Sequence, residues 1–249
     1  MLSFTQLLIL ATIFLITSIV SVVTGSNSLI TIPVMMQMGI EGRTALATNM
    51  MGLTFMSIGA SLPFLKQGTI NLQRLPKLII ITLISSALGA GLLFVIPSKS
   101  LPQLVSFFMI AVIIFSFLNR KAGVESTKEI SPGKQRLGYL VTFILGIYGG
   151  FFSGGYVTML TACFVGLFQM TYVEAIATTK VVNVFSSLIA PGIFITQDII
   201  DYPLGIILSI TMFIGGIVGS KVALKINNLW LRRIFIITVI ALAVIMMTK

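Results

Sequence analysis

Long uncharged runs recur along the whole chain and are separated by short polar stretches. They cover residues 78–98, 100–119, 137–173, 202–220 and 234–248. Each run reaches or approaches the ~20 apolar residues that a helix needs to cross the ~30 Å hydrocarbon core of a bilayer. The pattern therefore predicts an all-α polytopic membrane protein.

Turn residues and charges divide the apolar runs into ten hydrophobic segments, five on each side of a polar linker. The segments lie near 5–23, 27–40, 44–65, 77–96 and 101–118, and then near 137–152, 156–170, 173–196, 203–224 and 230–248. The 13 residues from Ser26 to Met38 would form a helix only about 20 Å long, too short for a full crossing. This stretch and its counterpart at 156–170 are predicted to form either hairpins that enter and return or short tilted helices.

The two groups of five segments are similar in sequence. One constant shift along the chain, called the repeat shift below, pairs Ala45 with Ala175 and Gly89 with Gly219 without a gap. The constant register predicts an internal repeat, in which short broken or hairpin helices open each copy. The predicted divisions are a first transmembrane repeat at 1–119, a linker at 120–136 and a second transmembrane repeat at 137–249.

Charge indicates how the two copies are oriented. The loop with Lys66, Arg74 and Lys77 in the first half corresponds to the loop with Asp198 and Asp201 in the second. Because Lys and Arg mark the cytoplasmic loops of membrane proteins, equivalent loops are expected on opposite sides. The halves are therefore predicted to be inverted repeats. The linker, which holds five Lys and Arg residues, would be cytoplasmic, and both termini would lie outside.

The composition excludes several classes of function. Hydrophobic residues make up 57% of the 249 residues and charged residues only 9%, with a mean hydropathy of +1.10. With one cysteine, Cys163, and no histidine, an internal disulfide, Cys/His metal sites and histidine-based catalytic triads are excluded. We therefore predict no enzyme, no cofactor and no metal site. The net charge of +10 is attributed to cytoplasmic loops and not to nucleic-acid binding.

Two short polar breaks interrupt the apolar segments, TGSNS at 24–28 and SGGY at 153–156. A helix that begins after such a break directs its backbone N–H groups and the positive end of its dipole toward the break. In transporters built from inverted repeats, interrupted segments at matching positions are the best sequence indication of the substrate site. The alternative is that the breaks are turns or close helix contacts. The predicted substrate-binding residues are Ser26, Asn27, Ser28, Ser153, Gly154 and Gly155.

A second group of polar residues occurs in TNMMG at 48–52 and in its repeat mate, TTKVVN at 178–183. An ionisable residue inside a membrane segment indicates function by default, and Lys180 and Asn183 share one helical face. Lys180 lies about seven residues, or ~10 Å, inside its segment, so the alternative is an anchoring lysine that extends to the lipid headgroups. The residues predicted to bind substrate here are Thr48, Asn49, Thr178, Thr179, Lys180 and Asn183.

The sequence resembles the TauE/SafE family of membrane transporters, also called sulfite exporters. The resemblance covers nearly the whole chain and is carried by GIYGGFFSGGY (146–156), EAIATTKVVN (174–183), DYPLGIILSI (201–210) and GGIVGSKVALKI (215–226). It implies a helix bundle with a duplicated unit that exports or exchanges sulfur-containing anions. It also places glycine-rich hairpins at 26–28 and 153–155. Where family members often have glycines, the first hairpin has Ser-Asn-Ser, which restricts the backbone more than glycine does.

These observations together predict a secondary transporter or facilitator that moves a small anion, such as sulfite or a sulfonate, across the bacterial cell membrane. The chain has no GxxxxGK[ST] motif and therefore no ATPase of its own. At about 100 mV, inside negative, moving one charge is worth ~2.3 kcal/mol, which favours outward movement of an anion about fiftyfold. Export is therefore the expected direction. An anion channel and a non-transporting membrane assembly subunit are the alternatives. The predicted partners are the small anionic substrate and the lipid bilayer, with no nucleic acid. The oligomeric state is left open, with a homodimer as one option.

Overall fold

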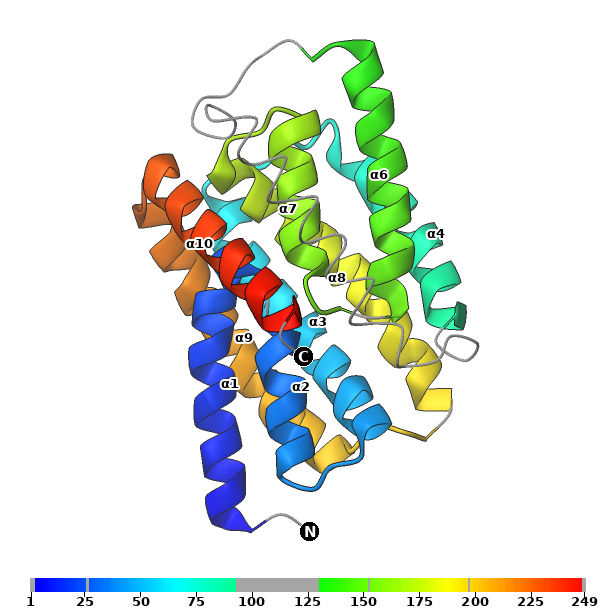
Figure 1. The fold of residues 1–249 in the computed structure, drawn as a ribbon, viewed down its shortest axis with the longest axis vertical. Coiled ribbons are helices and arrows are strands. Elements are labelled where there is room, and N and C mark those ends of the chain that lie inside the picture. The colour runs from blue at the N-terminus through cyan, green and yellow to red at the C-terminus, as the bar shows by residue number, and fades with distance from the viewer. Residues whose placement is uncertain (1–2, 26, 93–129, 152, 197, 248–249) are drawn as a thin grey trace.

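The computed structural model of the chain describes residues 3–25, 27–92, 130–151, 153–196 and 198–247, and these contain helices and no strand. The predicted segment at 101–118 and most of the predicted linker lie outside them. Figure 1 shows the arrangement. The helices are α1 (Phe4–Thr24), α2 (Ser28–Gln37), α3 (Gly42–Lys66), α4 (Leu75–Leu92), α6 (Pro132–Phe151), α7 (Tyr156–Leu167), α8 (Tyr172–Thr196), α9 (Tyr202–Lys225) and α10 (Asn228–Met247).

Two helix boundaries differ from the predicted ones for local reasons. Helix α6 begins at Pro132, five residues before the predicted segment, because proline suits the first turn of a helix and the Ser131 hydroxyl accepts from the Lys134 N–H. Helix α2 ends at Gln37 because Gly39 has a φ of +87° and turns the chain into α3.

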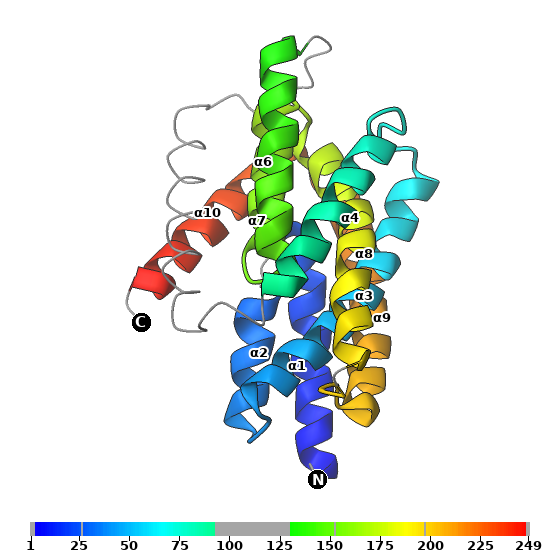
Figure 2. The same ribbon diagram turned by 90° about the vertical axis from the view of Figure 1, so that its right-hand side faces the viewer.

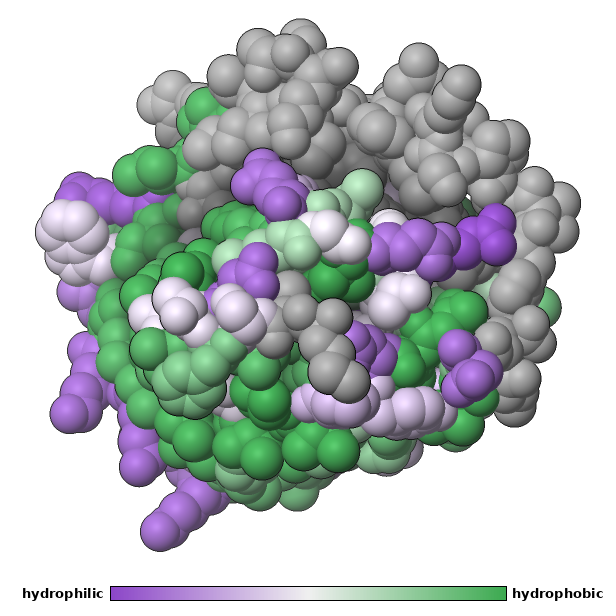
Figure 3. Space-filling view, turned by 90° about the horizontal axis from the view of Figure 1, so that it is seen from below, coloured by the Kyte–Doolittle hydropathy of each residue, from purple (hydrophilic) through white to green (hydrophobic). Residues whose placement is uncertain are grey.

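Three of the described helices, α1, α3 and α9, are long and apolar enough to cross a membrane. Helices α4 and α7 are also apolar but shorter. Their outer faces fit that setting. Ile206, Ile210 and Ile214 lie four residues apart on one face of α9 and are all exposed. The view from below also shows a broad apolar area on the surface of the molecule (Figure 3). Contiguous exposed apolar surface of this kind suits contact with lipid chains and not with water.

The helices form two hairpins that enter the molecule from opposite ends. In Figures 1 and 2, α1 and α2 occupy the lower part of the molecule, with α1 running up from the N-terminus and α2 returning down. Helices α6 and α7 occupy the upper part, with α6 running down and α7 returning up. Around them, α1 packs on α9, α6 packs on α4, and α3 packs on both α8 and α9. The two predicted forms of the short segments, hairpins that enter and return or short tilted helices, differ in their position relative to the membrane and both stay predictions.

Glycines allow the helices to approach backbone to backbone. A Cβ added to Gly89 of α4 would collide with the Ile147 carbonyl oxygen of α6. A Cβ added to Gly219 of α9 would lie 2.5 Å from the Ile19 carbonyl oxygen of α1. Small residues at helix contacts are the usual means of packing helices in a membrane, where no hydrophobic effect drives the helices together.

The described residues with positive φ angles fall into three pairs that the repeat shift relates. Gly25 (+78°) pairs with Gly155 (+79°), Gly39 (+87°) with Gln169 (+54°), and Gly68 (+66°) with Asp198 (+51°). Helices α3 and α8 are related by the same shift at both their ends, from 42–66 to 172–196. The turns of the two halves therefore have the same backbone conformation at the same positions.

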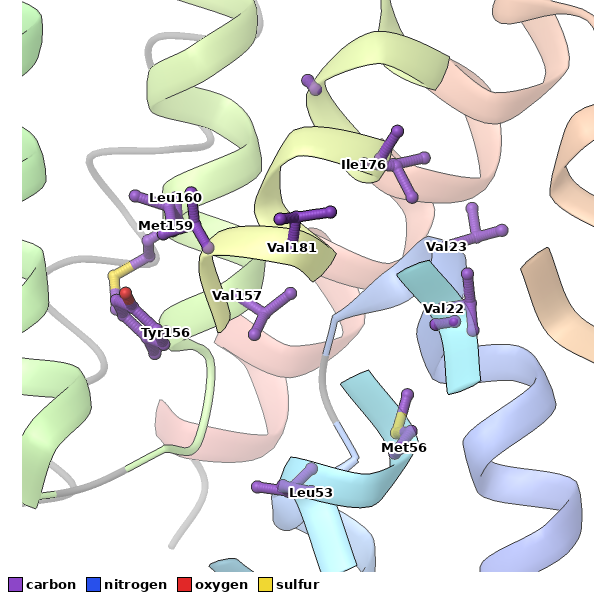
Figure 4. Packing of buried hydrophobic residues seen from close by; sticks show 14 of the residues in the cluster. Val22, Val23, Leu53, Met56, Tyr156, Val157, Met159, Leu160, Ile176 and Val181 are labelled. Carbon is purple, nitrogen blue, oxygen red and sulfur yellow. The ribbon is translucent and has the colours of Figure 1, made fainter. Parts of the chain in front are cut away.

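The core lies where the inner ends of the two hairpins meet α3 and α8. Figure 4 shows Val22 and Val23 of α1 near Leu53 and Met56 of α3, with the α7 and α8 residues of the same cluster beside them. Helix α8 begins within a capping box, because the Thr171 N–H donates to the Glu174 carboxylate at 2.8 Å and the Glu174 N–H donates to the Thr171 hydroxyl at 3.3 Å.

Candidate functional site

The two polar breaks are in direct contact. The hydroxyl oxygens of Ser28 and Ser153 lie 2.7 Å apart and share a hydrogen bond. The Thr158 hydroxyl, which is the repeat mate of Ser28, donates to the Thr24 carbonyl at 2.7 Å. Each hairpin therefore contacts the break of the other through the first helical turn after its own break. The structure brings together two segments that are about 125 residues apart in the chain.

The remaining break residues support this contact or lie beside it. Asn27 is buried at the start of α2, where its side-chain amide donates to the Met56 sulfur at 3.7 Å and its side-chain oxygen has no partner among the described residues. The Gly154 carbonyl accepts from the Tyr148 hydroxyl at 2.6 Å. Gly155 precedes α7 with a φ of +79°. Ser26, the other predicted residue of the first break, lies outside the described residues.

Helix termini of both signs converge at the breaks. Helices α2 and α7 begin there, and neither receives a side-chain cap from the residue before it, Asn27 or Gly155. Their N-termini therefore direct uncompensated positive dipole ends toward the meeting point. The negative C-terminus of α1 is compensated, because the Thr24 carbonyl accepts from Thr158 and the Ser21 carbonyl accepts from Lys180. Helix α6 also ends at Phe151, next to the second break, so two helix N-termini and two C-termini meet there.

Lys180 is buried inside the protein. It is the ninth residue of α8, its side chain is 2% exposed, and its ammonium donates to the Ser21 carbonyl at 3.1 Å. The ammonium is bonded to a carbonyl in the last turn of α1 and not to a carboxylate. The described acidic residues all lie at helix ends or in turns. A buried ammonium that donates to α1 does not reach the lipid headgroups, which argues against the anchoring alternative. Its repeat mate in the first half is Met50.

Asn49 and Thr179 connect the long helices to the short ones at equivalent places. The Asn49 amide donates to the Ser28 hydroxyl at 2.9 Å, and its oxygen accepts from the Thr31 hydroxyl at 2.7 Å. In the other half the Thr161 hydroxyl donates to the Thr179 hydroxyl at 3.4 Å. Thr31 and Thr161 were not among the residues predicted from the sequence, although the repeat shift pairs them with each other.

The remaining predicted residues bond elsewhere. The Asn183 amide donates to the Ser57 hydroxyl at 2.7 Å, which joins α8 to α3. Lys180 and Asn183, although both buried, therefore bond to different helices. The Thr48 hydroxyl accepts from the Asp201 N–H at 3.1 Å at the start of α9. The buried Thr178 hydroxyl has no hydrogen-bond partner in the described part of the chain.

A double-mutant cycle on Ser28→Ala and Ser153→Ala tests the contact between the breaks. We expect a coupling free energy of about 1 kcal/mol, the net value of one buried hydrogen bond. The measurement is the unfolding free energy of the purified protein in detergent for the two single variants and the double variant. A second cycle, on Ser28→Ala and Ser3→Ala, serves as the control and should be additive, because Ser3 caps the far end of α1. Additivity in the first cycle would show that the breaks do not interact.

Comparison with known proteins gives a consistent result. The chain is 28% identical over 236 residues to a probable membrane transporter protein of Haemophilus influenzae, covering 93% of this chain and 90% of that protein. It is 27% identical over 223 residues to the probable membrane transporter protein ORF9 of a Sinorhizobium species, covering 89% and 85%. It is 26% identical over 221 residues to the probable membrane transporter protein YfcA of Escherichia coli, covering 86% and 80%. Residues 9–246 match the model of the sulfite exporter TauE/SafE family. The chain is a membrane protein that belongs to the TauE/SafE family of membrane transporters.

Proposed function

We propose that the protein is a multi-pass cell-membrane transporter or facilitator that moves a small anion by alternating access. The observation that carries the proposal is the contact between the two breaks, where Ser28 is bonded to Ser153, together with the buried Lys180 bonded to Ser21 in the last turn of α1. Hydroxyl and amide groups, two helix N-termini and one ammonium are the groups that bind anions in proteins. Their occurrence at the breaks and in the last turn of α1 supports an anion site where the two hairpins meet.

The proposed architecture is a pair of inverted repeats, at 1–119 and 137–249, joined by a cytoplasmic linker at 120–136. The positive-φ turn residues, which the repeat shift relates in pairs, support a duplication. The helix packing supports it as well, because the repeat shift relates the contact of α1 with α9 to the contact of α6 with α4. The opposite directions of α1 and α6, and of α3 and α8, in Figure 1 support the inversion. Rocking of one repeat against the other would open the breaks to each side in turn.

The charges support an orientation for the molecule. Nine of the described Lys and Arg residues lie where α3 and α9 end and where α4, α6 and α10 begin. By the positive-inside rule this end faces the cytoplasm, and the N-terminus lies outside. The nine residues are Lys66, Arg74, Lys77, Lys134, Arg136, Lys221, Lys225, Arg232 and Arg233.

In the proposed mechanism an anion replaces two internal contacts. It takes the place of the Ser28–Ser153 hydrogen bond, so that each hydroxyl donates to the anion, and it draws the Lys180 ammonium from the Ser21 carbonyl. Helix α1 tolerates this loss because the Ser21 carbonyl also accepts from the Gly25 N–H at 2.8 Å. Asn49, which already donates to Ser28, would position that hydroxyl. The remaining residues of the proposed site are Ser26, Asn27, Thr48, Gly154, Gly155, Thr178, Thr179 and Asn183.

The family and the membrane potential support a substrate class and a direction. The description of the family as sulfite exporters favours sulfite or a related sulfonate as the anion and export as the direction. An inside-negative potential of about 100 mV contributes ~2.3 kcal/mol per negative charge that leaves the cell. Export therefore needs no coupled ion.

Replacement of Lys180 by methionine, the residue at its repeat mate, tests the proposal. We expect the flux of sulfite or of an organic sulfonate from proteoliposomes to fall at least about tenfold, because a hydrogen bond to a charged group is worth about 1.5–3 kcal/mol. The measurement is the initial rate per amount of reconstituted protein. Lys134→Met is the matched control, because it removes one exposed ammonium at the start of α6 and should leave the rate unchanged.

The same assay distinguishes the alternatives. A rate that saturates with anion concentration supports a transporter, and a rate that does not saturate indicates a channel. Flux no greater than that of empty liposomes would favour the assembly subunit. Equal flux from Lys180→Met and wild-type protein would show that the lysine only stabilises the end of α1.

A further inference from the structure

A groove opens on the surface of the molecule between the last turns of α3 and α9. Its volume is about 740 Å³, and its walls come only from these two helices and the residue after α3. It lies at the end of the molecule that carries most of the described Lys and Arg residues, and it is separate from the meeting point of the breaks. The groove is therefore not part of the proposed transport site.

The polar groups of the groove are all hydrogen-bond donors or neutral amides. Lys66, Lys221 and Lys225 line it together with the side chain of Gln67, and no acidic residue is among the lining residues. Lys221 and Lys225 are four residues apart on one face of α9. Three ammonium groups that share one groove repel one another, and a bound anion would relieve the repulsion.

Two apolar residues of the groove, Leu62 and Ile217, lie deeper than its lysines. Leu62 precedes Lys66 by four residues in α3, and Ile217 precedes Lys221 by four residues in α9. Both helices end at this side of the molecule, so each apolar residue lies one turn, about 5.4 Å, nearer to the middle of the molecule than its lysine. Leu62 is 48% exposed, and the deeper part of the groove is therefore an open apolar surface.

We propose that this groove binds an anionic phospholipid. The phosphate of the headgroup would bind Lys66, Lys221 and Lys225, and an acyl chain would lie against Leu62 and Ile217. The order of charged and apolar groups along the groove matches the order of headgroup and acyl chain in a membrane leaflet. The groove also continues the exposed apolar face of α9 at Ile206, Ile210 and Ile214, which lipid chains would already cover.

A comparison of the groove lysines with their repeat mates supports the binding of a lipid in one leaflet only. The repeat mates of Lys66 and Lys221 are Thr196 and Gly91, which carry no charge. Among the described residues, the corresponding helix ends therefore lack the equivalents of Lys66 and Lys221. Anionic lipids give the cytoplasmic leaflet a negative surface that attracts Lys and Arg next to a membrane segment. A bound lipid would bridge α3 of the first half to α9 of the second.

Binding of phosphatidylglycerol to the purified protein in detergent tests the proposal, with native mass spectrometry as the readout. We expect binding to the double variant Lys221→Gln/Lys225→Gln to be about thirtyfold weaker than to wild type, because each lysine contributes about 1 kcal/mol and about 1.4 kcal/mol is a factor of ten. Lys134→Gln/Arg136→Gln is the matched control, since it removes two charges at the same end of the molecule, outside the groove. Leu62→Glu, which places a carboxylate beneath Lys66, should weaken binding while keeping all three lysines.

Three results would overturn the proposal. The first is equal weakening in the groove variant and in the control variant, which would indicate attraction by net charge alone. The second is binding of phosphatidylcholine as tight as that of phosphatidylglycerol. The third is equally tight binding of glycerol phosphate, which has the headgroup phosphate without acyl chains and would indicate a site for a small free anion. The melting temperature of each variant without lipid shows that it is folded. The test uses no transport assay, and its result is therefore independent of the proposed transport function.

Discussion

Gly25→Ala is expected to destabilise the protein by about 3 kcal/mol, through two separate costs. Gly25 ends α1 with a φ of +78°, a conformation that costs an L-residue about 1–2 kcal/mol. The added Cβ would also lie 2.7 Å from the backbone nitrogen of Thr158 in α7. Because backbone atoms cannot rotate away, the hairpins would have to separate where Ser28 meets Ser153. The measurement is the unfolding free energy of the purified variant in detergent.

Gly39→Ala separates the two costs. Gly39 has a φ of +87°, but a Cβ added there would meet no atom within 4 Å. This variant should therefore lose only the conformational part, about 1–2 kcal/mol. The difference between the two variants measures how tightly the hairpins are pressed together at the breaks. Equal losses would mean that α7 moves away from Gly25 at no cost, and the breaks would then not form a fixed contact.

Gly89→Ala is expected to destabilise the contact between α4 and α6 by about 3 kcal/mol. The added methyl group would overlap the Ile147 carbonyl oxygen, and Gly150 of α6 lies beside the same position. Relief would require the two helix backbones to move apart along their length, which would also affect the nearby contact between Gly150 and Ser86. The fraction of protein that stays monodisperse after heating in detergent should fall accordingly.

Gly91→Ala is the matched control, two residues further along α4. A Cβ at Gly91 would meet no atom of the described residues within 4 Å, so this change should stabilise the helix by up to about 1 kcal/mol, the propensity difference between glycine and alanine. The two variants have the same chemistry in the same helix, and their effects should have opposite signs. Destabilisation by both would show that the loss at Gly89 does not depend on its contact with α6.

The helical segments and the turns between them could be predicted from the sequence. The predicted segment at 173–196 became α8 at 172–196, and the one at 44–65 became α3 at 42–66. Long apolar runs bounded by charges leave the chain little choice in a membrane, because only a helix satisfies its own backbone there. Both breaks were also predicted to bind substrate, since interrupted segments at matching positions of a repeat are the best sequence indication of the substrate site.

The partners of individual side chains could not be predicted. Lys180 bonds to the Ser21 carbonyl, which is 159 residues away, and a carbonyl leaves no signature in the sequence. Thr48 and Asn49 were both predicted to bind substrate. Successive residues of a helix point in different directions, and the Thr48 hydroxyl accepts from the Asp201 N–H whereas the Asn49 amide donates to Ser28. Periodicity indicates which residues share a face, whereas their contacts depend on how the helices pack.

The repeat shift identifies turn positions that residue type alone does not indicate. Gln169 and Asp198 adopt the positive φ of their mates, Gly39 and Gly68, although neither is a glycine. A search for glycines alone finds only one half of each of these pairs. The backbone has kept the shared turn in both halves, and the amino acid has changed.

The presence of Lys180 in one half, with Met50 at the corresponding place in the other, has a consequence for how such a protein can be encoded. An assembly of two identical subunits has either two lysines at these places or none. Two ammonium groups buried in one apolar interior would each need its own counter-charge, and none would leave the interior without a fixed charge. A single lysine therefore requires two different halves, and one chain that contains both copies provides them.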